Sequence, residues 1–164
     1  MYHLLFSFCE WLQNTEWALN VAGSTWAYPY VQMIHFTGLS LWVGTNLALD
    51  LSLLGVGRKR MTPAELSNAL FAWNWIGLGI AVTGGFMLFA TAATSFIVNP
   101  AFQIKLGLLL PLGLILHIIV QSKARTWGQT TTTPAVAKFA GFTELLLWLS
   151  VATAAVSIPI FEHI

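Results

Sequence analysis

The residues best suited to chemistry in this 164-residue chain are polar side chains set within long apolar stretches. An ionisable group in a membrane costs about 2.5 to 3.5 kcal/mol on insertion scales, so each is a default functional candidate. Two are histidines, His35 and His117, and imidazole is the usual axial ligand of b-type haem. Gly38 and Gly113 lie near them and could leave room for the edge of a macrocycle. The pattern predicts a metal or haem b site with both histidines as candidate ligands.

The depths of the two histidines argue against one haem held between them. At a rise of about 1.5 Å per residue, His35 and His117 differ by roughly 15 Å in depth. A haem standing upright in a membrane needs its two ligands at similar depth. Either there are two sites, or the second ligand is His3, His163 or a residue of a partner protein.

A second set of polar residues predicts a buried network. Trp42 and Asn46 share the helix face of His35, and Asp50 lies one turn further on. Lipid would penalise this line of residues, so it should face the protein interior, where Trp42 is a candidate cofactor contact. The expected network comprises Asn46, Asp50, Asn74, Glu144 and Lys105. Asp50, Asn74, His117 and Glu144 are expected in the cytoplasmic half of the membrane, and Lys105 in the outer half. Two carboxyl groups beside an imidazole could pass protons, tune a cofactor, or simply satisfy one another.

The composition requires lipid around the molecule. The chain is 57% hydrophobic and 8% charged, whereas an ordinary soluble domain is about 25% charged. Its few basic residues are scattered apart from one short run, which excludes a nucleic-acid surface. The lipid bilayer is therefore the expected surrounding.

Four apolar stretches, each longer than the roughly 20 residues that cross a bilayer, predict an all-α integral membrane four-helix bundle. The expected single domain covers residues 1–164, with spans at about 29–57, 63–98, 100–122 and 134–161. Residues 2–20 are too polar to span and predict an interfacial amphipathic helix.

Three of these helices are expected to begin with a capping residue followed by proline. The pairs are Thr62-Pro63, Asn99-Pro100 and Thr133-Pro134, and Glu65 completes a capping box with Thr62. Small residues predict close helix packing along two ridges: Gly77, Ala81 and Gly85 on the second span, and Ser40 and Gly44 on the first.

Basic residues predict the orientation in the membrane. They gather in the two loops expected between the first and second and between the third and fourth spans: Arg58, Lys59, Arg60, Lys123, Arg125 and Lys138. The positive-inside rule places these loops in the cytoplasm. The chain is thus expected in a bacterial inner membrane with both termini periplasmic.

Two segments of the sequence carry a resemblance, YPYVQMIHFTGLSLWVGTNLALDLSLLGVG and NPAFQIKLGLLLPLGLILH. They resemble an uncharacterised family of small four-helix bacterial membrane proteins, and more distantly CopD-type and cytochrome-b-like membrane domains. The similarity covers roughly residues 4–125, and its recurring positions fall on His35, Asp50, Arg58, Arg60, Asn99, Pro100 and Lys105. The resemblance implies fold and topology. Copper handling is disfavoured because the chain lacks Met-rich and His-rich clusters.

These observations leave three hypotheses for the function. The first is a cytochrome-b-like subunit that binds haem b and carries electrons between quinone and a periplasmic redox partner within a larger complex. The second is a non-catalytic accessory or anchoring subunit of a membrane assembly. The third is a transporter or channel, which would need a homo-oligomer because no inverted repeat is visible. No catalytic motif is visible on the chain alone, so whether it is an enzyme stays open.

Overall fold

The computed structural model describes residues 2–57, 61–127 and 133–163, and this part of the chain is all-helical. Its elements in chain order are α1 (Tyr2–Gln13), α2 (Glu16–Gly23), α3 (Ala27–Leu54), α4 (Pro63–Ala90), α5 (Ala93–Val98), α6 (Pro100–Ile104), the π-helix η1 (Lys105–Leu109), α7 (Leu110–Trp127), α8 (Ala135–Ser157) and the 3₁₀-helix η2 (Ile158–His163). The all-α prediction is confirmed for these residues. The Arg58–Arg60 run falls outside them, as does the side chain of His163.

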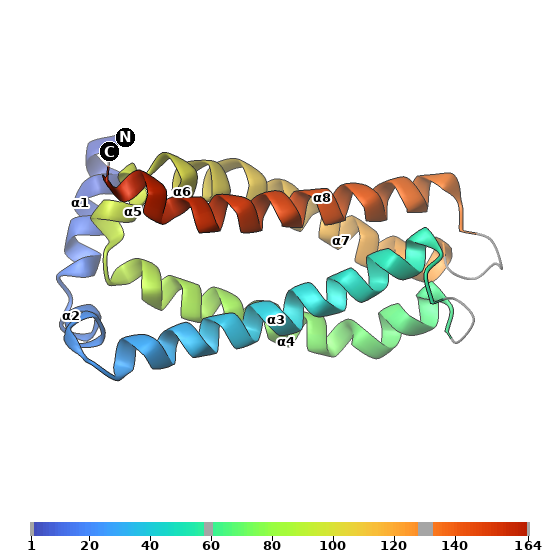
Figure 1. Cartoon of the computed structure of the whole chain (residues 1–164), viewed down its shortest axis with the longest axis horizontal. Coiled ribbons are helices and arrows are strands. Elements are labelled where there is room, and N and C mark those ends of the chain that lie inside the picture. Colours follow the sequence, from blue (N-terminus) through green and yellow to red (C-terminus); the bar gives the residue numbers. More distant parts are fainter. Residues whose placement is uncertain (1, 58–60, 128–132, 164) are drawn as a thin grey trace.

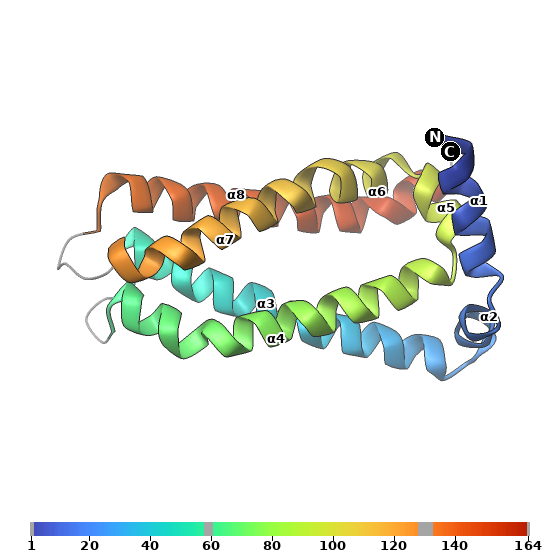
Figure 2. The same cartoon turned by 180° about the vertical axis from the view of Figure 1, so that it is seen from behind.

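The long helical segments α3, α4, α6–α7 and α8 run along the long axis of the molecule (Figure 1). Helices α1 and α2 lie across one end of them, and both ends of the chain lie there too. Seen from behind, α4 and α7 lie nearer the viewer, with α3 and α8 beyond them (Figure 2). Helix α3 packs against α4 and α8, and α7 packs against α4 and α8. The polar residues of these segments can therefore meet between them.

Three helical segments are long and apolar enough to cross a membrane: Pro63–Ala90, Pro100–Trp127 and Ala135–Phe161. Each has 27 or 28 residues, more than the roughly 20 residues that a bilayer core requires. Helix α3 also has 28 residues, but it carries the line of polar side chains noted above. The length and apolar composition of these three helices indicate that the chain is a membrane protein.

Two of the expected segments are interrupted. The segment expected over residues 2–20 breaks after Gln13, where the Asn14 and Thr15 side chains bond to the Glu10 and Leu12 carbonyls, a competition with helical bonding that ends a helix. The segment expected over 63–98 ends at Ala90 and resumes as α5. The break lets α5 pack against α1, around the buried residues Cys9, Leu12, Ala18, Ala90 and Ala93.

Two of the three predicted helix starts are confirmed. Thr62 and Glu65 form a complete capping box with Pro63 in the first turn of α4. Asn99 caps α6 by accepting bonds from the Ala101 and Phe102 amides. The prediction at Thr133 is wrong by one residue, because Pro134 occupies the N-cap position and makes no side-chain cap.

Glycines hold α3 and α4 in close contact. A Cβ atom added to Gly77 would lie 2.7 Å from the Trp42 backbone nitrogen, and one added to Gly38 would lie 2.8 Å from the Ile80 carbonyl carbon. The ridge predicted on α4 therefore meets the α3 backbone at Gly77, whereas at Gly85 it meets the His35 imidazole. The ridge predicted at Ser40 and Gly44 is wrong, because both are exposed and a Cβ on Gly44 would meet nothing within 4 Å.

The α3–α4 contact predicts a matched difference between alanine substitutions. Gly38→Ala and Gly77→Ala should each destabilise the protein by about 1–3 kcal/mol, because the added methyl group must push two backbones apart. Gly44→Ala and Gly79→Ala place the same methyl in open space and should be neutral or stabilising by up to about 1 kcal/mol. Thermal unfolding in one detergent compares the four variants, and equal losses in both pairs would contradict this packing.

Candidate functional site

Four helices bring one polar side chain each to a common point inside the molecule. Asp50 from α3, Asn74 from α4, His117 from α7 and Glu144 from α8 are all at most 1% exposed. Together they form what we call the polar cluster. Asn74, His117 and Glu144 each lie about ten residues, or ~15 Å, from the helix end at Pro63, Trp127 or Ala135.

The orientation of the Asn74 amide is fixed by Thr45. The Thr45 hydroxyl donates to the carbonyl oxygens of Leu41 and Trp42 in its own helix, at 2.9 and 2.8 Å. Its hydrogen is therefore used, and its oxygen can only accept from Asn74 Nδ2, at 2.8 Å. The same Nδ2 donates to Asn46 Oδ1. Asn74 Oδ1 must then be the atom that faces His117.

These roles determine which His117 nitrogen carries a proton. Asn74 Oδ1 lies 2.8 Å from His117 Nε2, and because a carbonyl oxygen accepts, Nε2 donates. The other ring nitrogen, Nδ1, lies 2.6 Å from Glu144 Oε1. Trp148 Nε1 also donates to that oxygen, at 3.2 Å. Glu144 Oε1 thus faces both His117 Nδ1 and the Trp148 indole N–H, and His117 and Glu144 form a buried hydrogen-bonded pair.

Asp50 lies within hydrogen-bonding reach of Glu144. In the described part of the chain, Asp50 Oδ1, Asp50 Oδ2 and Glu144 Oε2 are buried without a hydrogen-bond donor. Two carboxylate groups cannot bond to each other, since both only accept. One proton between Asp50 and Glu144 supplies the missing donor and removes the repulsion of two like charges away from water.

Further buried donors surround the polar cluster. Trp42 Nε1, Trp75 Nε1 and Asn46 Nδ2 are buried with no partner among the described residues. The Trp75 and Trp42 rings lie 5.7 and 6.1 Å from the His117 ring, so these donors are close to it. Buried donors beside buried acceptors are the arrangement that internal water molecules satisfy.

Both ring nitrogens of His117 are thus occupied by protein atoms. In this arrangement both nitrogens face hydrogen-bonding partners from other helices, and the expected role of His117 as a ligand stays a prediction. The space beside Gly113 is also filled, since a Cβ there would lie 3.1 Å from the Trp148 ring. Gly113 therefore makes room for an indole ring.

His35 and Lys105 lie away from the polar cluster. His35 Nδ1 is 2.7 Å from the Ala81 carbonyl oxygen, so Nδ1 donates and Nε2 of a neutral ring keeps its lone pair. Its neighbours Ala81 and Gly85 are seven and eleven residues from Asn74 on α4, or about 10 and 16 Å along the helix, so His35 lies well away in depth from the level of His117. The space beside Gly38 is filled by the α4 backbone. Lys105 is only partly buried.

The expected network is thereby divided in two. Asn46, Asp50, Asn74 and Glu144 meet around His117, whereas Lys105 begins the π-helix near His35. Among the described residues, no three His, Cys, Asp or Glu side chains are arranged to hold one metal ion.

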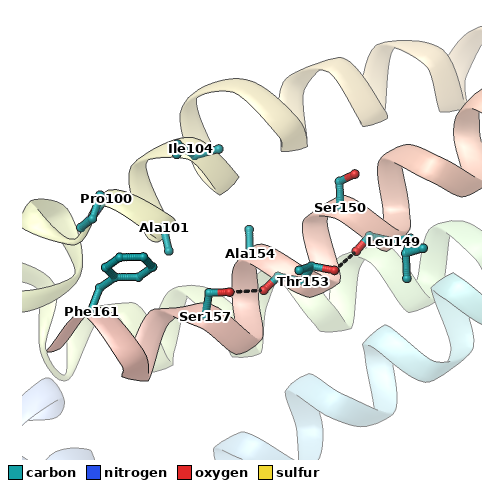
Figure 3. A pocket seen from close by; sticks show the side chains of 9 residues that line it. All are labelled: Pro100, Ala101, Ile104, Leu149, Ser150, Thr153, Ala154, Ser157 and Phe161. Atoms are coloured by element: carbon teal, nitrogen blue, oxygen red, sulfur yellow. Dashed lines mark hydrogen bonds between the residues drawn. The ribbon is translucent and has the colours of Figure 1, made fainter. Parts of the chain in front are cut away.

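A groove of about 470 Å³ lies apart from the polar cluster, between α6 and α8 (Figure 3). Its hydroxyl groups on Ser150, Thr153 and Ser157 donate to carbonyl oxygens of α8 itself. The groove is consequently apolar toward any occupant, and the charged and titratable groups described above do not line it.

Thr45 and Trp75 are further parts of the site that were not predicted from the sequence. Thr45 lies beside Asn46 in the sequence, and its one-turn spacing from Leu41 is the typical signal for a hydroxyl that bonds back to its own helix. Trp75 follows Asn74 directly, and nothing in its spacing alone distinguishes it from an aromatic residue that faces lipid.

A protein-family model described as "Family of unknown function (DUF6644)" matches residues 8–160. No curated protein and no solved structure matches the chain.

Removing the imidazole tests how the polar cluster is held together. His117→Ala leaves the Glu144 carboxylate and Asn74 Oδ1 buried without their partner, a change that costs about 3–5 kcal/mol for a broken buried pair. His3→Ala removes an exposed imidazole in α1 and should change stability by less than about 0.5 kcal/mol. Reversible unfolding in mixed micelles measures both, and a His117→Ala loss as small as that of His3→Ala would exclude the pair described here.

Proposed function

Because the chain belongs to the DUF6644 family, whose function is unknown, we propose from its geometry that it is a multi-pass membrane protein that binds and releases a proton at the polar cluster. The observation that carries the proposal is the pair of buried carboxyl groups on Asp50 and Glu144, whose facing oxygens lack a donor among the described residues. Two buried carboxyl groups that face each other can share one proton, and this proton can be released and bound again.

The charges of the polar cluster support this use. With one proton on Asp50, a carboxylate on Glu144 and an imidazolium on His117, the net charge is zero, which is the least costly state away from water. Releasing the Asp50 proton leaves a net charge of −1, with no change in any bond except one O–H bond. His117 stabilises that state because its positive charge remains beside Glu144.

The proposed setting is a bacterial inner membrane crossed by four helices, with α3 as the fourth. At 28 residues α3 is about 42 Å long, and it packs against α4, which it crosses near the middle of both helices (Figure 1). The exposed Trp11, Trp17 and Trp26 lie on or beside α1 and α2, which suits helices at the headgroup level. Lys123, Arg125 and Lys138 are exposed near the opposite end, which supports periplasmic termini.

Infrared spectroscopy in lipid nanodiscs tests for the proton. The wild-type protein at neutral pH should show the C=O stretch of one buried protonated carboxyl group, and raising the pH should remove it. Asp50→Asn should abolish this band, because the remaining Glu144 stays ionised beside His117. Glu10→Gln, which removes an exposed acid in α1, should leave it in place. A wild-type spectrum without the band, or a band that survives Asp50→Asn, would refute the proposal and favour a purely structural cluster.

A second candidate is a haem b subunit that carries electrons between quinone and a periplasmic partner. It is favoured by one contact, the bond from His35 Nδ1 to the Ala81 carbonyl, because a backbone acceptor on one ring nitrogen orients the other toward a ligand. A second ligand for this haem would come from another subunit, which fits the alternative that the chain is an accessory or anchoring subunit of a larger complex.

Optical spectra decide on haem. If the second candidate holds, protein purified in mild detergent should show a Soret band that changes on reduction. His35→Ala should abolish the Soret band. His117→Ala should retain it, because both ring nitrogens of His117 are hydrogen-bonded to protein atoms. A protein without a Soret band and without a pyridine haemochrome carries no haem.

A further inference from the structure

We infer that the polar cluster exchanges its proton with water at one end of the molecule only, the end where α4 begins and α7 ends, through Ser67 and Gln121. The inference rests on the proposed proton-binding function and adds a direction to it. The groups that face the exchanging pair are Asp50 from α3, Glu144 from α8 and His117 from α7, while α4 contributes the neutral Asn74.

One hydrogen bond between buried polar side chains lies between the polar cluster and this end of the molecule. Ser67 Oγ donates to Gln121 Oε1 at 3.3 Å, joining α4 to α7. Ser67 and Gln121 are 1% and 6% exposed, so water does not surround them as it does a surface pair. Gln121 lies one turn beyond His117, and Ser67 lies two turns before Asn74. Beyond Ser67, about one turn remains to the exposed Thr62 and Glu65.

The neighbouring path at the same end is apolar. Between α3, α7 and α8 lies a cluster of buried apolar residues: Leu49, Leu53, Val120, Ala124, Ala137 and Ala140. A proton does not cross such a cluster without hydrogen-bonding groups. Ser52 on α3 is also buried near this end, but its hydroxyl has no partner among the described residues, whereas Ser67 and Gln121 are joined by a hydrogen bond between α4 and α7.

Toward the α1 end, the polar cluster is closed by two indole rings. Trp42 precedes Asn46 by one turn on α3, and Trp148 follows Glu144 by one turn on α8, which runs toward that end (Figure 1). Their ring centroids are 4.4 Å apart, and both side chains are buried. Backbone contacts at Gly77 and the Gly113–Trp148 contact fill the space around them.

The proposed step moves one proton and nothing else. Asp50 gives its O–H proton to water at the Ser67–Gln121 side and becomes a carboxylate, and the water becomes hydronium. The reverse step restores the neutral cluster. His35 and Lys105, which lie toward the α1 end, take no part.

Hydrogen–deuterium exchange of the carboxyl band tests the direction. On transfer to D₂O, Ser67→Ala and Gln121→Leu should each slow the isotope shift of the band by about tenfold, the rate change that matches one lost hydrogen-bonded step. Ser150→Ala is the matched control, because it removes an exposed hydroxyl of α8 toward the α1 end, and its rate should equal that of the wild type. If Gln121→Leu does not fold, Ser67→Ala decides.

A double variant tests the barrier. Trp42→Ala in the Gln121→Leu or Ser67→Ala background should restore fast exchange by opening the α1 side. Unchanged exchange in Ser67→Ala and Gln121→Leu, equal slowing by Ser150→Ala, or no restoration by Trp42→Ala would overturn one-sided access. A wild-type protein without the band would instead overturn the proton-binding function itself, so the two failures are distinguishable.

Discussion

The hydrogen bond between the Thr45 hydroxyl and its own helix sets the chemistry of the site. Because that hydrogen is used inside α3, the Thr45 oxygen must accept from Asn74, and the Asn74 carbonyl must accept from His117. The imidazole is then directed at Glu144, which leaves the far oxygen of Glu144 to Asp50. The contact also needs α3 and α4 to lie very close, which Gly38 and Gly77 permit.

The sequence is a good guide where a local rule acts. The capping box at Thr62 and the cap at Asn99 follow from residue type and spacing within one turn, and both occur. The cost of polar groups in lipid likewise indicated that Asp50, Asn74 and Glu144 should turn inward, and these residues meet around His117. Local breaks were missed at Asn14 and Thr91, where side chains bond to helix carbonyls.

The sequence could not predict which helix or side chain packs beside each glycine. Gly38 and Gly113 suggested room for a flat cofactor, yet the first meets the α4 backbone and the second meets Trp148. A glycine shows only that something approaches closely, and tertiary packing decides whether this is a ligand or the protein itself. The hydrogen-bond partners of the two His117 nitrogens also depend on tertiary packing, since they come from two other helices.

The π-helix at Lys105–Leu109 has a consequence for chain length. A π turn holds one residue more than an α turn, and one residue corresponds to a rotation of about 100° around the helix axis. His117 follows this wide turn on the same continuous helix. The wide turn takes up its additional residue locally, so the helical segments on either side of it keep their directions. Losing one residue between positions 105 and 109 would therefore leave an ordinary α-helix and keep the imidazole with its partners, whereas the same loss between residues 110 and 117 would rotate His117 by about 100° relative to the preceding segment.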